Sequence, residues 1–297
     1  MEINIEKIKE NKTTKELLEF GIINIDKSSG PTSFNVSEFV KKKIGARKTS
    51  HFGTLDPKVT GVLPVAINRA CKLAGYFLGE DKTYIGIMQM HGEVEFKKIE
   101  KAIKEKFLGK IIQLPPVKSR VKRQERPRTI YSFDLLEKKG NNVLFKVKCE
   151  GGTYIRKLCT DLGEYLEVGA HMLELRRIKA GIFLEEDKDY PLVSLYDFEK
   201  AVEEYKEGNE NLLRKMIIPG EIISELFPAI EIKEMSVKAI FHGSPIHEDE
   251  VTRKEFLNYE LNQKLVVFSK NKFIGIFRVI KEGNLFARSE FTLQPLN

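Results

Sequence analysis

The sequence contains few cysteines, and it lacks the residue spacings that usually hold a metal ion or a disulfide framework. Its three thiols are Cys71, Cys149 and Cys159, and none of them belongs to a C-x-x-C pair. An odd and sparse set of cysteines is typical of a reducing compartment and argues against disulfides or a thiolate zinc site. The five histidines show no H-E-x-x-H or similar spacing, so we expect no metal site.

Motifs for nucleotides and signals for membranes are also missing. The chain has no G-x-x-x-x-G-K-[ST] motif, so we expect chemistry that needs neither a nucleotide nor another cofactor. It has no apolar run long enough to span a bilayer, and its charged N-terminus lacks the apolar core of a signal peptide. We therefore expect a soluble, cytoplasmic protein without a membrane partner.

The size and charge of the chain suggest a globular protein with an acidic partner. Its 297 residues suffice for about two domains, and 41% of them are hydrophobic, as in proteins with a buried core. Lysine and arginine number 50 against 43 acids, which gives a net charge of +7. Basic residues cluster at 41–48 and at 118–128. Such runs are most often solvated faces, but two runs flanking one candidate site favour contacts with phosphates.

Apolar periodicity predicts an N-terminal region of interleaved strands and helices. Thr32 or Ser33 should cap a helix that carries apolar residues at helical spacing through Ile44. Strands are predicted at 21–25, 83–90, 130–137 and 142–150, and helices at 68–78, 97–107 and 153–166. The basic segment 118–128 has no clear period and is predicted to be a loop. This mixture without regular βαβ spacing favours an α+β domain.

The remaining segments predict an extension, a connection and a small β domain. Residues 1–19 are highly charged and predict an extension or a fraying helix, and 195–221 predict a connecting helix. From about residue 228 the chain turns to short β-like runs, notably KLVVFS and FIGIFRVI around the tight turn SKNK. We therefore expect three parts, at 1–19, 20–225 and 228–297.

The segment HFGTLDPKVTGVLP, residues 51–64, is the most informative part of the chain. It places a single acid, Asp56, in a turn bounded by Gly53 and Gly61, and Pro57 biases this acid away from helix. Such a turn can present one carboxylate close to a partner's backbone. An Asp-Pro sequence is more often only a turn, because aspartate hydrogen-bonds to its own backbone there.

Resemblance favours the functional interpretation. The string GTLDPKVTGVLP resembles the active-site segment of the TruB and dyskerin family of RNA pseudouridine synthases. Further strings follow in family order: DKSSGPTS (26–33), KTYIGIMQMHGEV (82–94), QLPPVKSRVKRQERPRTIY (113–131) and CEGGTYIRKLCTDLG (149–163). The tail, which opens with EIKEMSVKAIFHGSPI, resembles a PUA domain. Several matches in register are hard to obtain by chance.

The resemblance implies a fold and an activity. The expected fold is α+β, with a catalytic domain of a mixed, largely antiparallel sheet flanked by helices, followed by a small β-barrel PUA domain. The expected reaction isomerises specific uridines in rRNA, with tRNA as a further substrate, to pseudouridine. An isomerisation needs no outside energy, which agrees with the missing nucleotide and metal motifs.

The same resemblance assigns roles to three residues. Asp56 matches the catalytic aspartate, which acts by covalent attack or by proton abstraction from the ribose. Arg156, in GGTYIRKL, matches the arginine that pairs with this acid and keeps it ionised. Tyr84, in KTY, matches the tyrosine that stacks on the target base, although a strand tyrosine is as often part of a core.

Other residues are assigned to substrate and RNA contacts. His51, Leu158 and Lys27 match residues around the uridine, with Leu158 as the apolar wall of the uracil pocket. The basic loop resembles the family's thumb-like loop, and its expected RNA-binding residues are Lys118, Arg120, Lys122, Arg123, Arg126 and Arg128. The chain departs from the family where Ser28 replaces the usual proline and where the bulky Phe52 follows His51.

Three functions remain as alternatives. The thumb and linker segments resemble archaeal or dyskerin-like enzymes, which work with H/ACA guide RNA and substrate RNA. The resemblance then also implies small partner proteins of the Nop and Gar type and a kink-turn-binding protein. A stand-alone tRNA pseudouridine synthase of TruB type is the second alternative, and an RNA-binding scaffold without catalysis is the third.

Overall fold

The computed structural model describes residues 1–115 and 124–295, which divide into two compact units. One unit spans Ile22–Met216, and the other combines Met1–Gly21 with Ile217–Asn297. The N-terminal residues therefore group with the C-terminal part of the chain. The domain boundaries predicted from the sequence, at 1–19, 20–225 and 228–297, stay predictions.

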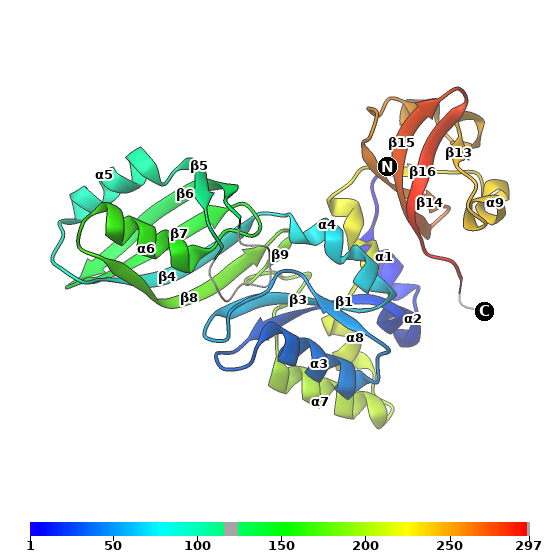
Figure 1. Ribbon diagram of the computed structural model, residues 1–297. Helices are drawn as coiled ribbons and strands as arrows, with labels where there is room; N and C mark the ends of the chain where they lie inside the picture. The colour runs from blue at the N-terminus through cyan, green and yellow to red at the C-terminus, as the bar shows by residue number, and fades with distance from the viewer. Residues whose placement is uncertain (116–123, 296–297) are drawn as a thin grey trace. The chain divides into compact units, whose positions relative to one another are not determined.

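The larger unit is built on a mixed sheet (Figure 1), whose strand order is β10-β1-β3-β8-β4-β7-β6-β5. Its strands are β1 (Phe20–Lys27), β3 (Thr60–Asn68), β4 (Lys82–Met90), β5 (Gly109–Gln113), β6 (Arg126–Lys139), β7 (Asn142–Cys149), β8 (Ala170–Ala180) and β10 (Val193–Ser194). The short β2 (Thr49–His51) pairs with β3, and β9 (Phe183–Leu184) pairs with β8. Pairs β3–β8 and β1–β10 are parallel, whereas β4 runs antiparallel to β7 and β8, and β6 to β5 and β7. The mixed, largely antiparallel sheet is thus confirmed.

Helices cover this sheet with apolar stripes. The helices of the unit are α3 (Ser33–Ile44), α4 (Ala74–Leu78), α5 (Phe96–Lys106), α6 (Ile155–Tyr165), α7 (Leu195–Lys206) and α8 (Asn211–Met216). Figure 1 shows α5 and α6 together over the strands β6, β7, β4 and β8. Helix α6 buries Leu158, Cys159 and Leu162, because residues three and four apart share one face of a helix. Among the described helices, none combines the length and the apolar composition needed to cross a membrane.

Helix α3 begins where the sequence predicts. The Thr32 hydroxyl accepts a hydrogen bond from the backbone N–H of Asn35 at 3.0 Å, and the Asn35 side chain accepts one from the backbone N–H of Thr32 at 3.1 Å. This reciprocal cap satisfies two N–H groups that the first turn leaves without partners. The helix ends at Gly45, whose φ of 68° is a left-handed angle that a side chain would disfavour.

Three predicted elements differ from the structure. Residues 68–78 form a 3-10 turn (Arg69–Leu73) followed by the short α4, because Gly75 in its first turn lowers helix propensity. The predicted connecting helix is divided into α7 and α8, since Gly208 with a φ of 99° ends α7. The basic segment was predicted to be a loop, but Arg126 and Arg128 lie on β6 and pair with Gln113 and Ile111 of β5.

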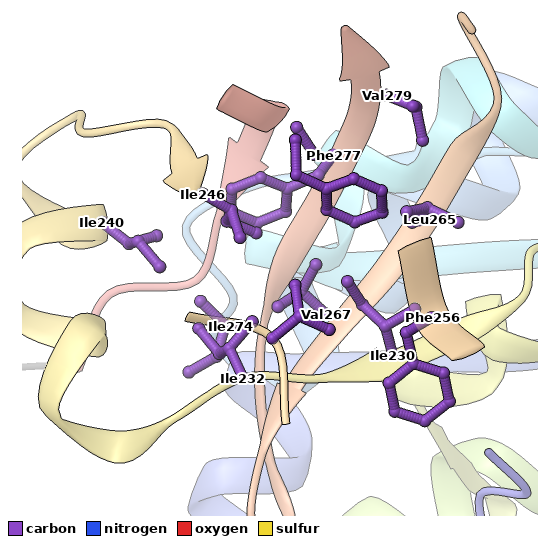
Figure 2. Packing of buried hydrophobic residues seen from close by; sticks show 13 residues of the cluster. Ile230, Ile232, Ile240, Ile246, Phe256, Leu265, Val267, Ile274, Phe277 and Val279 are labelled. Carbon is purple, nitrogen blue, oxygen red and sulfur yellow. The ribbon is translucent and has the colours of Figure 1, made fainter. Parts of the chain in front are cut away.

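The smaller unit contains a curled sheet that fits the predicted PUA domain. Its order is β12-β14-β15-β16-β13, with β12 (Ala229–Glu231), β13 (Ile246–His247), β14 (Lys264–Ser269), β15 (Lys272–Glu282) and β16 (Leu285–Thr292). The predicted strands KLVVFS and FIGIFRVI are confirmed as β14 and β15, and a tight turn at Lys270 joins them. Figure 2 shows the apolar core of the unit, in which Phe256, Phe277 and several isoleucines and valines pack together.

The N-terminal residues, for which the sequence predicts an extension or a fraying helix, form two short helices that group with this smaller unit. Helices α1 (Ile5–Glu10) and α2 (Thr14–Glu19) carry side-chain caps from Asn4 and Thr13. Between them, Lys12 donates a hydrogen bond of 2.5 Å to the buried carboxylate of Glu221, in the turn Gly220–Glu225. Phe20, after α2, packs on Phe273 of β15 with 5.3 Å between ring centroids.

Candidate active site

Asp56 and Arg156 form an ion pair, although 100 residues separate them in the sequence. Asp56 lies in the connection between β2 and β3, which we call the Asp56 loop (residues 52–59), and Arg156 lies in the first turn of α6. Their side chains are about half exposed, at 49% and 55%. The pair is therefore accessible to an external substrate, and the predicted meeting of these two side chains occurs in the structure.

Buried Lys27 holds the backbone of the Asp56 loop. Its ammonium donates to the carbonyl oxygens of Pro57 at 2.9 Å, Val59 at 2.7 Å and Ser28 at 3.0 Å. The residue has no exposed surface, and burial lowers the pKa of its amine. In place of the predicted substrate contact, the structure gives Lys27 a role in fixing the loop, because a buried ammonium needs acceptors and finds them there.

A Lys27→Met variant should therefore be destabilised by about 3 kcal/mol, because buried carbonyl groups lose their donor and each costs about 1–3 kcal/mol. Unfolding in urea measures this change. Exposed Lys58, in the same loop, supplies the control Lys58→Met, which should unfold at the wild-type midpoint. Equal midpoints for both variants would contradict the role of Lys27.

Other contacts fix the remaining part of the loop. The Ser33 hydroxyl accepts a hydrogen bond from the backbone N–H of Leu55 at 2.8 Å and donates to its carbonyl at 3.1 Å. His51 contacts the Thr54 hydroxyl at 3.1 Å, at the start of the loop. Phe52, the bulky departure from the family pattern, is buried and stacks on Phe77 with 4.7 Å between centroids. Phe52 therefore fills the core beneath the loop.

Tyr84 lies on β4 and is 7% exposed. Burial raises the pKa of its phenol, while the positive charge of Arg177 and a hydrogen bond with it oppose this rise. Arg177, on β8, also donates to the carbonyl oxygens of Gly53 at 3.0 Å and Val62 at 2.8 Å. Tyr84 is thus connected to the Asp56 loop through a buried arginine.

The sequence interpretation missed two buried cations beside the loop, Arg177 and Lys82. Lys82 donates to the Phe77 carbonyl at 3.3 Å, and burial, then the charge of Arg177, lower its pKa to about 8. A Cβ at Gly53 would lie 3.2 Å from Arg177 Nη1 and 3.6 Å from Lys82 Cε, and the φ of Gly53 is +95°. Only glycine allows the loop to approach both cations without strain. No local signal in the sequence marked Arg177, because it follows a second arginine and its burial depends on the fold.

The other residues predicted for the site either lie on elements other than the Asp56 loop or fall outside the described residues. Leu158 is fully buried in α6 and has no surface with which to border an open pocket. The Arg128 guanidinium pairs with the Glu150 carboxylate at 3.4 Å. Lys118, Arg120, Lys122 and Arg123 lie outside the described residues. In the described ranges, no three His, Cys, Asp or Glu side chains gather as a metal ion requires.

Family comparisons match most of the unit that holds this site. Residues 41–155 match the N-terminal domain of the TruB family of pseudouridylate synthases. Residues 156–224 match the C-terminal domain of tRNA pseudouridylate synthase B. The chain belongs to the TruB family. As a member of this family it is a pseudouridine synthase, an enzyme that isomerises uridine in RNA, and Asp56 and Arg156 come from the two adjoining matched segments.

Archaeal relatives extend the family match over most of the chain. A probable tRNA pseudouridine synthase B of Methanopyrus kandleri is 47% identical over 247 residues, which cover 83% of this chain and 72% of the relative. The corresponding protein of Methanosarcina barkeri is 40% identical over 97% of this chain and 81% of its own length.

Solved structures confirm the architecture of this TruB-family protein. The chain is similar to one in a Cbf5-Nop10-Gar1 complex, with a TM-score of 0.86, 35% identity and coverage of 97% of this chain and 89% of that one. It is also similar to one in an H/ACA ribonucleoprotein bound to a substrate RNA that contains 2'-deoxyuridine. There the TM-score is 0.84, with 34% identity and the same two coverages. The α+β catalytic domain followed by a PUA domain is thus confirmed.

Proposed function

We propose that this TruB-family enzyme uses Asp56 to form pseudouridine at uridines that an H/ACA guide RNA selects. The observation that carries the catalytic part is the exposed Asp56–Arg156 pair on a loop whose backbone is held from beneath. A carboxylate in this position can reach a ribose from outside, while the buried contacts keep the loop from moving away.

In the proposed reaction, every bond that breaks or forms lies within the substrate, and the numbers of protons lost and gained are equal. The bond from uracil N1 to ribose C1' breaks, the base turns, and a bond forms from C5 to C1'; C5 loses its proton and N1 gains one. The Asp56 carboxylate either attacks C1' or removes a proton from the ribose. Arg156 orients the carboxylate toward the ribose, because a guanidinium binds a carboxylate at fixed angles.

Tyr84 is proposed to stack on the extruded uracil. Extrusion of a paired base costs about a few kcal/mol, and stacking on an aromatic ring returns roughly 1–3 kcal/mol. The support is that Tyr84 pairs in the β4–β8 register with Arg177, which also holds the loop that carries Asp56. His51, at the entry of the same loop, is proposed either to occupy the place left by the flipped base or to contact the RNA backbone.

Guide RNA is favoured by likeness to Cbf5 in H/ACA assemblies. The solved relatives contain Nop10, Gar1 or a substrate RNA, and each covers 97% of this chain. We propose corresponding partners here: guide and substrate RNA, Nop- and Gar-type proteins, a kink-turn-binding protein, and a cytoplasmic location. A stand-alone tRNA enzyme is the second candidate, and the names of the archaeal relatives favour it.

The test uses RNA with tritium at C5 of the target uridine, which is released when pseudouridine forms. The protein is incubated with this RNA, with and without a guide RNA and the partner proteins. Release only with the guide supports the proposal, and release without the guide supports the stand-alone enzyme. No release under any condition indicates an RNA-binding scaffold.

The basic thumb-like loop yields a separate prediction from the sequence. Replacing Arg120, Lys122 and Arg123 by alanine should reduce the slope of log affinity against log salt by about one for each lost phosphate contact. A control replaces three exposed lysines elsewhere in the unit, Lys188, Lys200 and Lys206, and should keep the slope. RNA affinities over a salt series measure both, and an unchanged slope in the first variant would refute the role.

A further inference from the structure

Arg177 is a buried arginine that, among the described residues, has no carboxylate partner. It lies on β8 with 1% of its surface exposed, and it is the largest of the fully buried side chains. In the part of the chain that the structure describes, no acidic side chain lies within ion-pair distance of its guanidinium. Its neighbour Arg176 instead pairs with Asp26 and Glu185. Burial of an uncompensated charge is costly, so the arrangement calls for an explanation beyond stability.

The hydrogen bonds of Arg177 go to the two sides of Asp56. Its Nη2 donates to the carbonyl of Gly53, three residues before Asp56, and its Nε donates to the carbonyl of Val62, six residues after it. The backbone of Arg177 pairs with Gly61 of β3, where a Cβ would lie 2.2 Å from the Arg177 carbonyl oxygen. One residue of β8 thus fixes both ends of the Asp56 loop.

The third partner of this guanidinium is Tyr84. Strands β4 and β8 are adjacent, and Tyr84 is paired with Arg177 in their register. The positive charge of the guanidinium acts on the phenol and lowers its pKa, against the larger effect of burial. The other cation nearby, Lys82, is directed to the backbone carbonyls at the end of α4. Arg177 is therefore the group that joins the loop of the catalytic acid to the aromatic ring.

We propose that Arg177 is a positioning residue for the isomerisation, which holds Asp56 and Tyr84 at a fixed separation across the uridine. This inference rests on the roles proposed above for those two residues. A guanidinium suits the task because its planar fork donates to several acceptors at fixed angles, whereas an ammonium on a flexible stem does not. Small displacements matter, since a shift of about 1 Å in a reacting group can cost about 100-fold in rate.

The test compares Arg177→Lys with Arg176→Lys in the complete guide-dependent reaction. The two variants remove one guanidinium each from adjacent positions of β8, but only Arg177 contacts the Asp56 loop. At a temperature where both are folded by circular dichroism, the single-turnover rate should fall about 100-fold for Arg177→Lys, with RNA affinity within twofold of wild type. For Arg176→Lys the single-turnover rate should stay within threefold of the wild-type rate, even if its melting temperature is lower.

A second variant keeps the inference testable if Arg177→Lys does not fold. Tyr84→Phe retains the ring and removes the hydroxyl on which the charge of Arg177 acts, and it should slow turnover about 10-fold without weakening RNA binding. If the wild type is active and Arg177→Lys turns over at the wild-type rate, the inference is wrong and the proposed function stands. If Arg177→Lys is unfolded, a wild-type rate in Tyr84→Phe has the same meaning. A wild type without product in any reaction overturns the proposed function, and the inference with it.

Discussion

An Asp56→Asn variant should bind substrate RNA with wild-type affinity and form pseudouridine at least about 10³-fold more slowly. The asparagine amide has nearly the shape of the carboxylate, but it cannot attack C1' or accept a proton from the ribose. RNA affinity should be retained, because the basic residues that we propose to contact phosphates lie elsewhere in the chain. The loop should also keep its shape, since its backbone is held by Lys27 and Ser33 rather than by the Asp56 side chain.

Tritium release and RNA binding, measured on the same preparation, check this expectation. Asp134→Asn is the matched control, because Asp134 is an exposed acid on β6 of the same unit. It loses the same charge and should turn over at the wild-type rate. Turnover of Asp56→Asn within tenfold of wild type would exclude Asp56 as the catalytic group.

Elements with a strong apolar period could be predicted from the sequence, and those that depend on pairing could not. Helix α6 buries Leu158, Cys159 and Leu162 at helical spacing, and α3 has a readable cap at Thr32. Strand β5 was missed because three of its five residues are exposed and its buried side chain is the polar Gln113, so it has no apolar alternation, and its pairing with β6 defines it. The same pairing explains why the end of the basic segment is a strand.

The same distinction applies to the site: residues in recognisable strings could be predicted, and roles that depend on the folded neighbours could not. Asp56 and Arg156 could be predicted because the strings around them resemble a family, whereas their spacing of 100 residues carries no information by itself. Lys27 could be recognised by another of these strings, DKSSGPTS, but its function depends on which carbonyl oxygens the fold brings near. Arg177 escaped notice because a charge on a strand indicates a solvated face until the burial of that face is known.

Replacement of Arg156 should lower the turnover rate strongly and leave the stability of the fold almost unchanged. Surface ion pairs contribute about 0–1 kcal/mol, and both side chains of this pair are about half exposed and screened by water. An Arg156→Ala variant should therefore melt within about 3 °C of wild type. Its turnover should nevertheless fall about 100-fold, because Asp56 loses the cation that orients it. Arg156→Lys should lie between the two, since it restores the charge without the planar fork.

The double variant Asp56→Asn/Arg156→Ala decides whether Arg156 acts through Asp56. If it does, the double variant should be no slower than Asp56→Asn alone, because the arginine has no catalytic carboxylate left to orient. Neighbouring Lys157, which pairs with Asp161 on α6, supplies the control Lys157→Ala, whose turnover should match wild type. Single-turnover rates and melting temperatures are measured for Asp56→Asn, Arg156→Ala, the double variant and Lys157→Ala. Rate losses that multiply in the double variant would show that Arg156 contributes independently of Asp56, and the ion pair would then not be the catalytic unit.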